Sequence, residues 1–344
     1  MGVIATEGLT KHYGAGGLRA RVGGASGRGR GPGRGGAIRA LQEVTLDVRE
    51  GEVFGFLGPN GAGKSTLIRL LLGFLHPTAG GARVLGLDIV RDSVAIRVRV
   101  GYLPGGIALY DGLTGERHLD YLAELSARAP VRREALCDRL ELSARTLRRP
   151  IRDYSRGMRQ KIGIVQALQH DPELAILDEP SEGLDPLMQR AFYDILDDLR
   201  RDGRTVFLSS HVLAEVERVC DRVAIVRAGR LVALEDVAGL IRRRKRRVEI
   251  ELDGPAPDLS AVPGISELVV GERRITCALE GDPRPLLAML GGAPVTDVTI
   301  EPARLEDAFL ELYAGEDAAE AGDDEPDAGP VDGPGVPDTP VAGR

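Results

Sequence analysis

A glycine-rich segment between an apolar run and a helical run carries the clearest chemical pattern in the sequence. The segment "GPNGAGKST" (58–66) follows "EVFGFL" and opens "TLIRLLLG", so it fits GxxxxGK[ST] in a strand–loop–helix context. Glycines let backbone N–H groups turn inward around phosphates, and the helix N-terminus adds positive potential. The segment therefore predicts a nucleotide site in which Lys64 reaches the β- and γ-phosphates and Ser65 holds Mg²⁺. The expected binding residues of this segment are Gly58, Pro59, Asn60, Gly61, Ala62, Gly63, Lys64, Ser65 and Thr66.

Two adjacent carboxylates supply a second part of this chemistry. The segment "LAILDEP" (174–180) is an apolar run that ends in Asp178 and Glu179. Asp178 can bind Mg²⁺ directly or through water, and Glu179 can polarise the attacking water as a general base. An Asp-Glu pair at a strand end is common on protein surfaces. Together with the phosphate loop, however, the pair predicts nucleotide hydrolysis.

The elements that position these residues belong to an α/β fold. From about 40 to 240, apolar strand candidates alternate with segments of helical period. The candidates "EVFGFLG", "LAILDEP" and "TVFLSS" are nearly continuous apolar runs, as expected for strands buried on both faces of a mostly parallel sheet, and "RVAIVRAG" is a fourth. Residues 112–170 are more helical. We expect a P-loop NTPase fold with a mixed sheet and a helical subdomain.

The N-terminal segment predicts a strand and an insertion. Residues 3–13 alternate like an edge strand. Residues 14–39 are rich in Gly and Arg and contain no acid, so they cannot bury enough apolar surface to fold. We expect a disordered loop inserted into a sheet, which completes a first domain over residues 1–240.

The C-terminal part predicts a second, smaller domain over residues 241–314. Its pattern is a strand, a short helix or loop, a hairpin turning near Gly271, a helix, a strand and a helix, a βαββαβ-like order similar to a ferredoxin-like unit. The basic run at 242–247 is expected to be a solvated helix end and linker. Residues 315–344 are acidic and rich in Pro and Gly, and we expect them to be disordered.

Composition excludes some classes of function. The net charge of the 344-residue chain is −7, but residues 316–344 contain nine acids and one base, so the remainder is close to +1. A nearly neutral body gives no global electrostatic case for nucleic acid. No apolar run approaches the ~18–20 residues of a membrane span, and no secretory signal is present, so we expect any membrane role to come through a partner. The three cysteines are expected to be free thiols in a reducing cytosol.

With these motifs in order, residues 3–235 resemble the nucleotide-binding subunit of an ABC transporter. The segment "YSRGMRQK" (154–161) is similar to the family's LSGGQ signature, and "SEGLD" (181–185) resembles its D-loop. His211, after a strand, matches the switch histidine that contacts the γ-phosphate. Tyr13 matches the aromatic residue that stacks on adenine. The resemblance implies that Glu179 and His211 are catalytic and that Asp185 belongs to the D-loop.

The resemblance also implies partners. Two cassettes would pair head to tail around two ATP molecules, so each signature serves the other subunit's site. The signature residues acting in trans are Ser155, Arg156, Gly157, Met158 and Gln160. Since one chain carries one phosphate loop and one signature, a C2 homodimer is the simplest solution. We expect this dimer at the cytoplasmic face of the membrane, bound to a separate membrane permease. The C-terminal domain is similar to an extension of drug- and antibiotic-export ATPases, which favours export.

One position departs from the family pattern. After "GYLP" the family carries a glutamine that contacts Mg²⁺ or the attacking water, whereas this chain has Gly105. The glutamine could be dispensable, its loss could slow hydrolysis, or the chain could bind ATP without turnover. The intact Glu179 and His211 argue against the last alternative. We therefore expect Gly105→Gln to raise ATPase activity or leave it unchanged.

Two other functions stay open at this point. A soluble ABC-type ATPase acting on nucleic acid or ribosomes would give the Gly/Arg-rich insertion a role. Such relatives, however, usually carry two cassettes in one chain or a long coiled coil between halves, and this chain has neither. We therefore expect no stable nucleic-acid partner. A nucleotide-gated regulatory module would bind ATP and would show no turnover dependent on Glu179.

Overall fold

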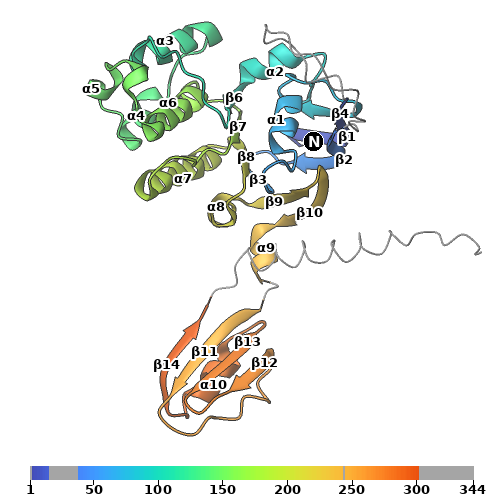
Figure 1. Ribbon diagram of the computed structural model, residues 1–344, viewed down its shortest axis with the longest axis vertical. Helices are drawn as coiled ribbons and strands as arrows, with labels where there is room; N and C mark the ends of the chain where they lie inside the picture. The colour runs from blue at the N-terminus through green and yellow to red at the C-terminus, as the bar shows by residue number, and fades with distance from the viewer. Residues whose placement is uncertain (1, 15–37, 243–244, 302–344) are drawn as a thin grey trace, which may run out of the picture.

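A six-stranded sheet forms the centre of the computed structural model, which describes residues 2–14, 38–242 and 245–301 (Figure 1). Its strand order is β10-β9-β3-β8-β7-β6, and the five strands from β9 to β6 run parallel, whereas β10 pairs antiparallel with β9. The strands are β3 (Val53–Leu57), β6 (Val100–Leu103), β7 (Leu174–Asp178), β8 (Thr205–Ser210), β9 (Arg222–Arg227) and β10 (Arg230–Asp236). Every residue of β3, β7 and β8 is buried, which confirms the prediction from their continuous apolar runs.

Helices cover both faces of this sheet. Because successive strand side chains point to opposite faces, Phe54 and Phe56 join one apolar core, with α1, whereas Val53 and Leu57 join another, with α7 and α8. The helices that accompany the sheet are α1 (Lys64–Leu71), α2 (Ser93–Arg99), α7 (Pro186–Arg201), α8 (Leu213–Val219) and α9 (Val237–Arg242).

A second, antiparallel sheet has the order β2-β1-β4-β5. Its strands are β1 (Ile4–Tyr13), β2 (Ile38–Val48), β4 (Ala79–Val84) and β5 (Leu87–Asp88). The prediction of an edge strand at 3–13 is wrong, because β1 lies between β2 and β4. Its alternating pattern reports one buried face and one solvated face, and that pattern does not distinguish an edge strand from a central one.

The insertion predicted at 14–39 ends earlier than expected, because strand β2 already begins at Ile38. Ile38 and Arg39 belong to β2 and pair with Tyr13 and His12 of β1. Residues 15–37 lie outside the described residues, so the prediction of disorder stays a prediction.

The predicted helical subdomain connects β6 to β7 (Figure 1). Its elements are α3 (Gly115–Ser126), α4 (Arg133–Arg139), α5 (Ala144–Leu147), the 3₁₀ turn η1 (Ile151–Asp153) and α6 (Arg156–Leu168). Thr114 and Ser155 cap α3 and α6 by accepting backbone N–H groups of the first turn. Apolar residues of α3 and α6, among them Leu119 and Ile162, join the core that also contains α7.

The C-terminal part forms a third sheet with its own apolar core. The order is β12-β13-β11-β14, and all three pairings are antiparallel. Its elements are β11 (Arg246–Leu252), β12 (Ile265–Val270), β13 (Arg274–Leu279), α10 (Arg284–Leu290) and β14 (Val295–Ile300). The predicted hairpin is confirmed, since β12 pairs with β13 around Gly271.

The first connection of the predicted βαββαβ order is a loop in the structure. Residues 253–264 contain no helix, because Pro255, Pro257 and Pro263 restrict the backbone of this segment and of the residues before them. The loop alternative is the one adopted. The last predicted helix, 303–313, and the acidic segment 315–344 lie outside the described residues, and the domain boundaries stay predictions.

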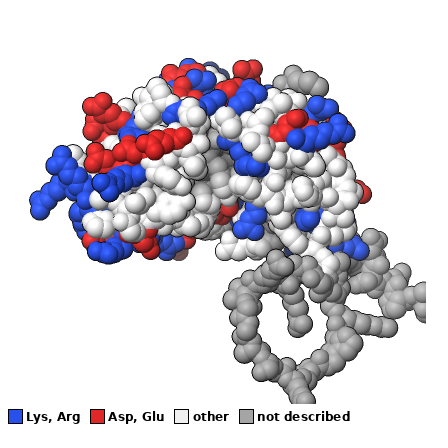
Figure 2. All heavy atoms as spheres, turned by 90° about the horizontal axis from the view of Figure 1, so that it is seen from above, with Lys and Arg blue, Asp and Glu red and all other residues white. Residues whose placement is uncertain are grey.

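The surface seen in Figure 2 carries charges of both signs. Blue and red side chains are interspersed with uncharged surface over much of this face, rather than being separated by sign. In the part of the chain that the structure describes, no helix is both long enough and apolar enough to span a bilayer.

Candidate functional site

The glycine-rich loop between β3 and α1 has the backbone geometry expected of an anion site. Gly61 and Gly63 have φ angles of 85° and 109°, a region that side chains disfavour. A Cβ at Gly63 would lie 2.4 Å from the carbonyl oxygen of Ala40, so glycine is required there for space as well. Helix α1 has no side-chain cap and no acid in its first turn. Its N-terminal N–H groups therefore remain available to phosphate oxygens.

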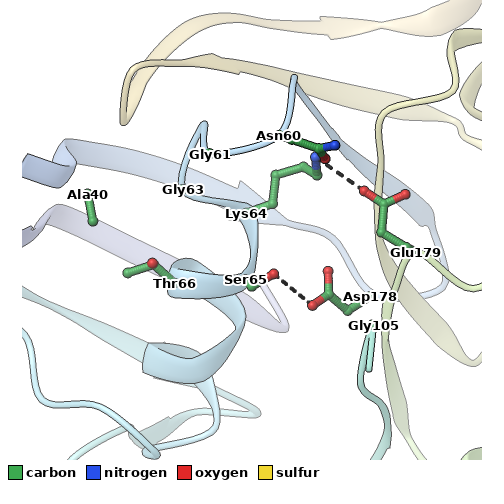
Figure 3. Close-up of a pocket in the computed structure, with 10 residues that line it drawn as sticks. All are labelled: Ala40, Asn60, Gly61, Gly63, Lys64, Ser65, Thr66, Gly105, Asp178 and Glu179. Atoms are coloured by element: carbon green, nitrogen blue, oxygen red, sulfur yellow. Dashed lines mark hydrogen bonds and ion pairs between the residues drawn. The ribbon is translucent and has the colours of Figure 1, made fainter. Parts of the chain in front are cut away.

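This loop lines one wall of an open pocket of about 330 Å³ (Figure 3). The lining residues are Ala40, Asn60, Gly61, Gly63, Lys64, Ser65, Thr66, Gly105, Asp178 and Glu179. The structure thus brings the loop together with both predicted carboxylates and with the Gly105 position. Ala40 was not predicted, because it contacts the loop from β2, far away in sequence.

Three predicted loop residues shape the loop without lining the pocket. The carbonyl oxygens of Gly58 and Pro59 accept hydrogen bonds from Lys64 Nζ at 2.7 and 3.3 Å. Ala62 is buried, and its carbonyl accepts a hydrogen bond from the Gly229 N–H at 3.0 Å. These contacts hold the loop around the lysine.

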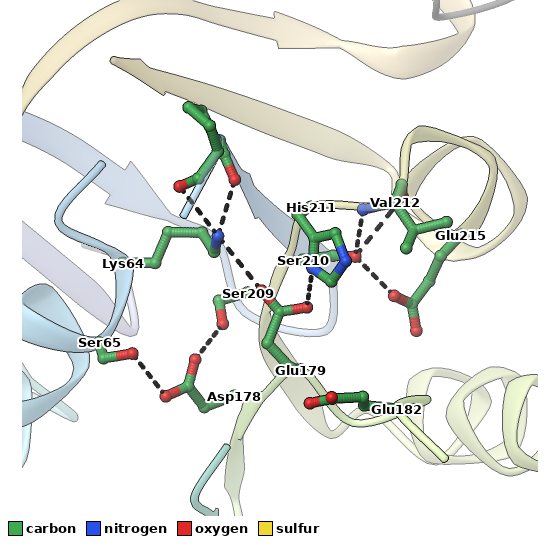
Figure 4. Close-up of polar contacts among 12 residues, drawn as sticks. Lys64, Ser65, Asp178, Glu179, Glu182, Ser209, Ser210, His211, Val212 and Glu215 are labelled. Carbon is green, nitrogen blue, oxygen red and sulfur yellow. Dashed lines mark hydrogen bonds and ion pairs between the residues drawn. The ribbon is translucent and has the colours of Figure 1, made fainter. Parts of the chain in front are cut away.

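Lys64 links the loop to the second carboxylate. Its buried ammonium lies 3.2 Å from Oε1 of Glu179, while the loop carbonyls occupy its other donors (Figure 4). The lysine is therefore held on the pocket wall, with its charge beside the N-terminus of α1. An ammonium at this place can neutralise phosphate charge.

Ser65 and Asp178 form the second pair across the pocket. The Ser65 hydroxyl donates to Oδ2 of Asp178 at 2.9 Å, and the Ser209 hydroxyl donates to Oδ1. A hydroxyl beside a carboxylate offers the oxygen ligands that Mg²⁺ prefers, and Mg²⁺ usually keeps water and phosphate oxygens as its remaining ligands. This donor set fits the predicted cation.

Glu179 and His211 meet because their strands are neighbours. Strands β7 and β8 run parallel, with Asp178 opposite Ser209, so the residues that follow them emerge at the same edge of the sheet. Nδ1 of His211 lies 2.7 Å from Oε2 of Glu179. Glu179 has a left-handed φ of 51°, and its N–H donates to the Ser209 carbonyl at 3.1 Å. The carboxylate is thus held between Lys64 and His211 (Figure 4).

Gly105 follows β6 and lies against Asp178 (Figure 3). A Cβ built at this position would be 3.3 Å from both Cγ and Oδ2 of Asp178. The backbone therefore approaches the carboxylate more closely than most side chains would tolerate. Gly105 lines the pocket, as expected for the Q-loop position, but it contributes no polar side chain.

The predicted signature residues lie at the start of α6, and none of them lines this pocket. Ser155 caps the helix by accepting the Met158 N–H at 3.2 Å. The Arg156 guanidinium pairs with Glu182, and a Cβ at Gly157 would lie 3.0 Å from the Gly183 carbonyl. These contacts join the signature to the predicted D-loop of the same chain.

Two further contacts extend this junction. The buried Gln160 donates from Nε2 to the Pro180 carbonyl at 2.7 Å. Asp185 caps α7 by accepting the N–H groups of Leu187 and Met188 at 3.1 and 3.0 Å. The segment after Glu179 is thus held between α6 and α7.

Tyr13 lies at the end of β1, where the Lys11 ammonium is 5.5 Å from the centre of its ring. It does not line the pocket, although β2 beside it contributes Ala40. The adenine-stacking role of Tyr13 stays a prediction.

Sequence reasoning missed the polar residues beside His211. Ser209 and Ser210 directly precede the predicted switch histidine, and Ser210 donates to Oε2 of the buried Glu215 at 2.7 Å. Two serines at the carboxyl end of an otherwise apolar strand were the available signal. Polar residues at that edge of a parallel sheet face the site.

Comparisons with known proteins agree with this geometry. The family model described as "ABC transporter" matches residues 41–182. A daunorubicin resistance ATP-binding protein of Streptomyces coeruleorubidus is 35% identical over 80% of this chain and 91% of its own length. The chain belongs to the ABC transporter ATP-binding protein family.

Two further comparisons, with one relative and one solved structure, cover shorter parts of this chain. An uncharacterised ABC transporter ATP-binding protein of Synechocystis is 40% identical over 59% of this chain, and the chain spans 58% of that relative's length. A solved ATP-binding subunit of an ABC transporter has a TM-score of 0.58 and 30% identity, and it covers 70% of this chain and 92% of its own length. The ABC ATPase fold is thus shown, and the site described above belongs to it.

Proposed function

We propose that this chain is the ATP-hydrolysing subunit of an ABC exporter and that it acts with MgATP at a dimer interface. The observation that supports this most directly is the juxtaposition of the glycine-rich loop with the Asp178 and Glu179 carboxylates in one pocket. Lys64 and His211 both contact Glu179, so the two ends of the site are joined through the predicted general base.

In the proposed reaction, the backbone of the loop and the N-terminus of α1 hold the phosphates. Mg²⁺, held by Ser65 and Asp178, would neutralise charge on the phosphate oxygens. Lys64 would exchange its contact with Glu179 for a phosphate oxygen. Glu179 would then orient the attacking water and accept its proton, while His211 remains as its hydrogen-bond partner.

A dimer is proposed because the signature lies apart from the pocket. Ser155 and the start of α6 do not line the cavity of their own chain. A second copy placed head to tail would bring its helix N-terminus to the γ-phosphate. Only the triphosphate would hold the pair together, so hydrolysis would release it.

The proposal also couples ATP hydrolysis to export through a separate membrane permease. The name of the daunorubicin resistance relative supports a role in drug or antibiotic export. We place the dimer at the cytoplasmic face of the membrane, where such a permease would present its loops.

The full-length chain and its Glu179→Gln variant test the proposed chemistry. We expect MgATP hydrolysis by the purified chain, loss of turnover in the variant, and retained ATP binding in both. Asp178→Asn should weaken the dependence of binding on Mg²⁺. Equal background ATPase in the two proteins would refute the hydrolysis proposal and favour a regulatory module.

A pull-down from detergent extracts tests the partner. We expect a membrane protein with several spans to be captured by the Glu179→Gln variant in the presence of MgATP. Recovery of RNA or ribosomes, with no such membrane protein, would favour the alternative of an ATPase acting on nucleic acid.

A further inference from the structure

We propose that Glu215 is a positioning residue for His211 and that it acts through the Ser210 hydroxyl. This inference rests on the proposed ATPase function, because it assigns a role in turnover to a residue outside the known motifs. Glu215 lies in the first turn of α8 and is 2% exposed.

Two hydrogen bonds place Ser210 at the centre of this arrangement. Its Oγ donates to Oε2 of Glu215 at 2.7 Å and accepts the N–H of Val212 at 3.0 Å (Figure 4). Ser210 and Val212 are the two chain neighbours of His211. Glu215 therefore fixes the orientation of the hydroxyl that ties both sides of the histidine together.

The backbone around Ser210 is anchored on the side of the nucleotide pocket as well. The Ser210 carbonyl accepts the N–H of Gly58 at 3.3 Å, and the preceding Ser209 hydroxyl donates to Asp178. Consecutive residues at the end of β8 thus contact the phosphate loop, the predicted magnesium ligand and the general base. A shift of Ser210 would be transmitted to the 2.7 Å contact between His211 and Glu179.

The environment of Glu215 favours its neutral form. Burial is the main cause that raises its pKa, and the Glu179 carboxylate adds to the effect, whereas the nearby Ser210 and Ser181 hydroxyls and the charge of His211 oppose it. The other titratable groups that face it are Tyr193 of α7 and Cys220 after α8.

Burying a carboxyl group is costly, and a position that served packing alone would be served better by an apolar residue. Among the described residues, Oε1 of Glu215 has no hydrogen-bond partner, whereas Oε2 accepts the Ser210 hydroxyl. Glutamine has the same shape and can accept the same hydrogen bond. This predicts that an amide can replace the acid, whereas alanine cannot.

Steady-state ATPase assays on the full chain, together with measurements of MgATP affinity and melting temperature, test the inference. We expect Glu215→Ala and Ser210→Ala each to lower kcat by about 10- to 100-fold, because small displacements of catalytic groups have effects of that size. KM and MgATP affinity should change by less than about twofold. Glu215→Gln should keep kcat within about threefold of the unmodified chain. Glu217→Gln, on the same helix, is the matched control and should leave kcat unchanged.

The double variant Ser210→Ala/Glu215→Ala distinguishes positioning from general destabilisation. We expect it to be no worse than the poorer single variant, because both changes remove the same contact. Full kcat in Glu215→Ala, or equal losses in Glu215→Gln and Glu215→Ala, would overturn the inference while leaving the ATPase proposal intact. Parallel losses of melting temperature, MgATP affinity and kcat would also overturn it. Background ATPase in both the unmodified chain and Glu179→Gln would overturn both proposals.

Discussion

The carboxylate of Glu179 contacts two side chains, Lys64 and His211, and it is also the general base in the reaction that we propose. Its oxygens lie 3.2 Å from Nζ of Lys64 and 2.7 Å from Nδ1 of His211. A left-handed φ of 51° directs the backbone at this point, so the side chain is aimed by the chain as well as by its partners.

The first prediction concerns the chemistry of this carboxylate. Glu179→Gln keeps the size of the side chain but removes the base, so kcat should fall by about 10²- to 10⁴-fold. Steady-state phosphate release measures this effect. Glu134→Gln, at an exposed position of α4 away from the site, is the control for loss of an acid, and it should retain most of its activity.

The second prediction concerns Gly105, where the structure modifies the expectation from the sequence. A Cβ at this position must displace the Asp178 carboxylate by a few tenths of an ångström. Gly105→Ala should therefore lower ATPase activity modestly, by about threefold, through a strained contact worth less than ~1 kcal/mol.

The comparison between Gly105→Ala and Gly105→Gln isolates the polar group. Both variants carry the same Cβ, so a higher rate in the glutamine variant would show that an amide contributes at this position. Abolition of turnover in Gly105→Gln, with activity kept in Gly105→Ala, would contradict the assignment of this position to the Q-loop.

At the scale of elements, the strands and the sequence motifs could be predicted from the sequence. The contacts between residues on neighbouring strands could not. The apolar runs of β3, β7 and β8 and the loop at 58–66 were recognisable, because burial on both faces and phosphate binding constrain local sequence. The contacts of Ser209 and Ser210 with other strands depend on register between segments far apart in the chain. A period-two pattern likewise shows only that one face of a strand is buried, and it does not show how many neighbouring strands there are. For this reason the prediction that β1 is an edge strand was wrong.

The helical subdomain carries the third prediction, which concerns pH. His118 of α3 is buried, its Nε2 lies 3.0 Å from Oε1 of Gln166, and its Nδ1 has no partner among the described residues. Burial lowers the pKa of His118 below its ordinary value, although the Gln166 contact opposes this.

Because the folded pKa of His118 is depressed, the unfolded chain binds more protons in the window below about pH 6.5. Stability contributed by neutral His118 is therefore present above that pH and is lost as pH falls. The melting temperature of the unmodified chain should decline more between about pH 7 and 5.5 than that of His118→Gln. His76→Gln, at an exposed position, should retain the full decline; equal slopes in all three proteins would contradict the prediction.

At the scale of the whole molecule, the fourth prediction concerns the proposed dimer and follows from the separation of Ser155 from the pocket of its own chain. If each site uses Lys64 of one subunit and Ser155 of the other, Lys64→Ala and Ser155→Arg should each be inactive alone. A mixed dimer would contain one intact site, so random mixing should restore about one quarter of the normal activity.

Mixing Lys64→Ala with Glu179→Gln is the control, because both changes damage the same half of the site and no intact site can form. Restoration in this control, or its absence from the first mixture, would contradict the head-to-tail arrangement. Phosphate release after co-refolding or subunit exchange measures both outcomes.

The ion pair between Lys64 and Glu179 has a consequence for how nucleotide affinity is measured. Nucleotide and carboxylate compete for one ammonium group, so part of the intrinsic affinity of the loop is masked in the unmodified chain. Glu179→Gln removes the competitor along with the base. A dissociation constant determined on that hydrolysis-deficient protein should therefore be lower than the dissociation constant of the unmodified chain.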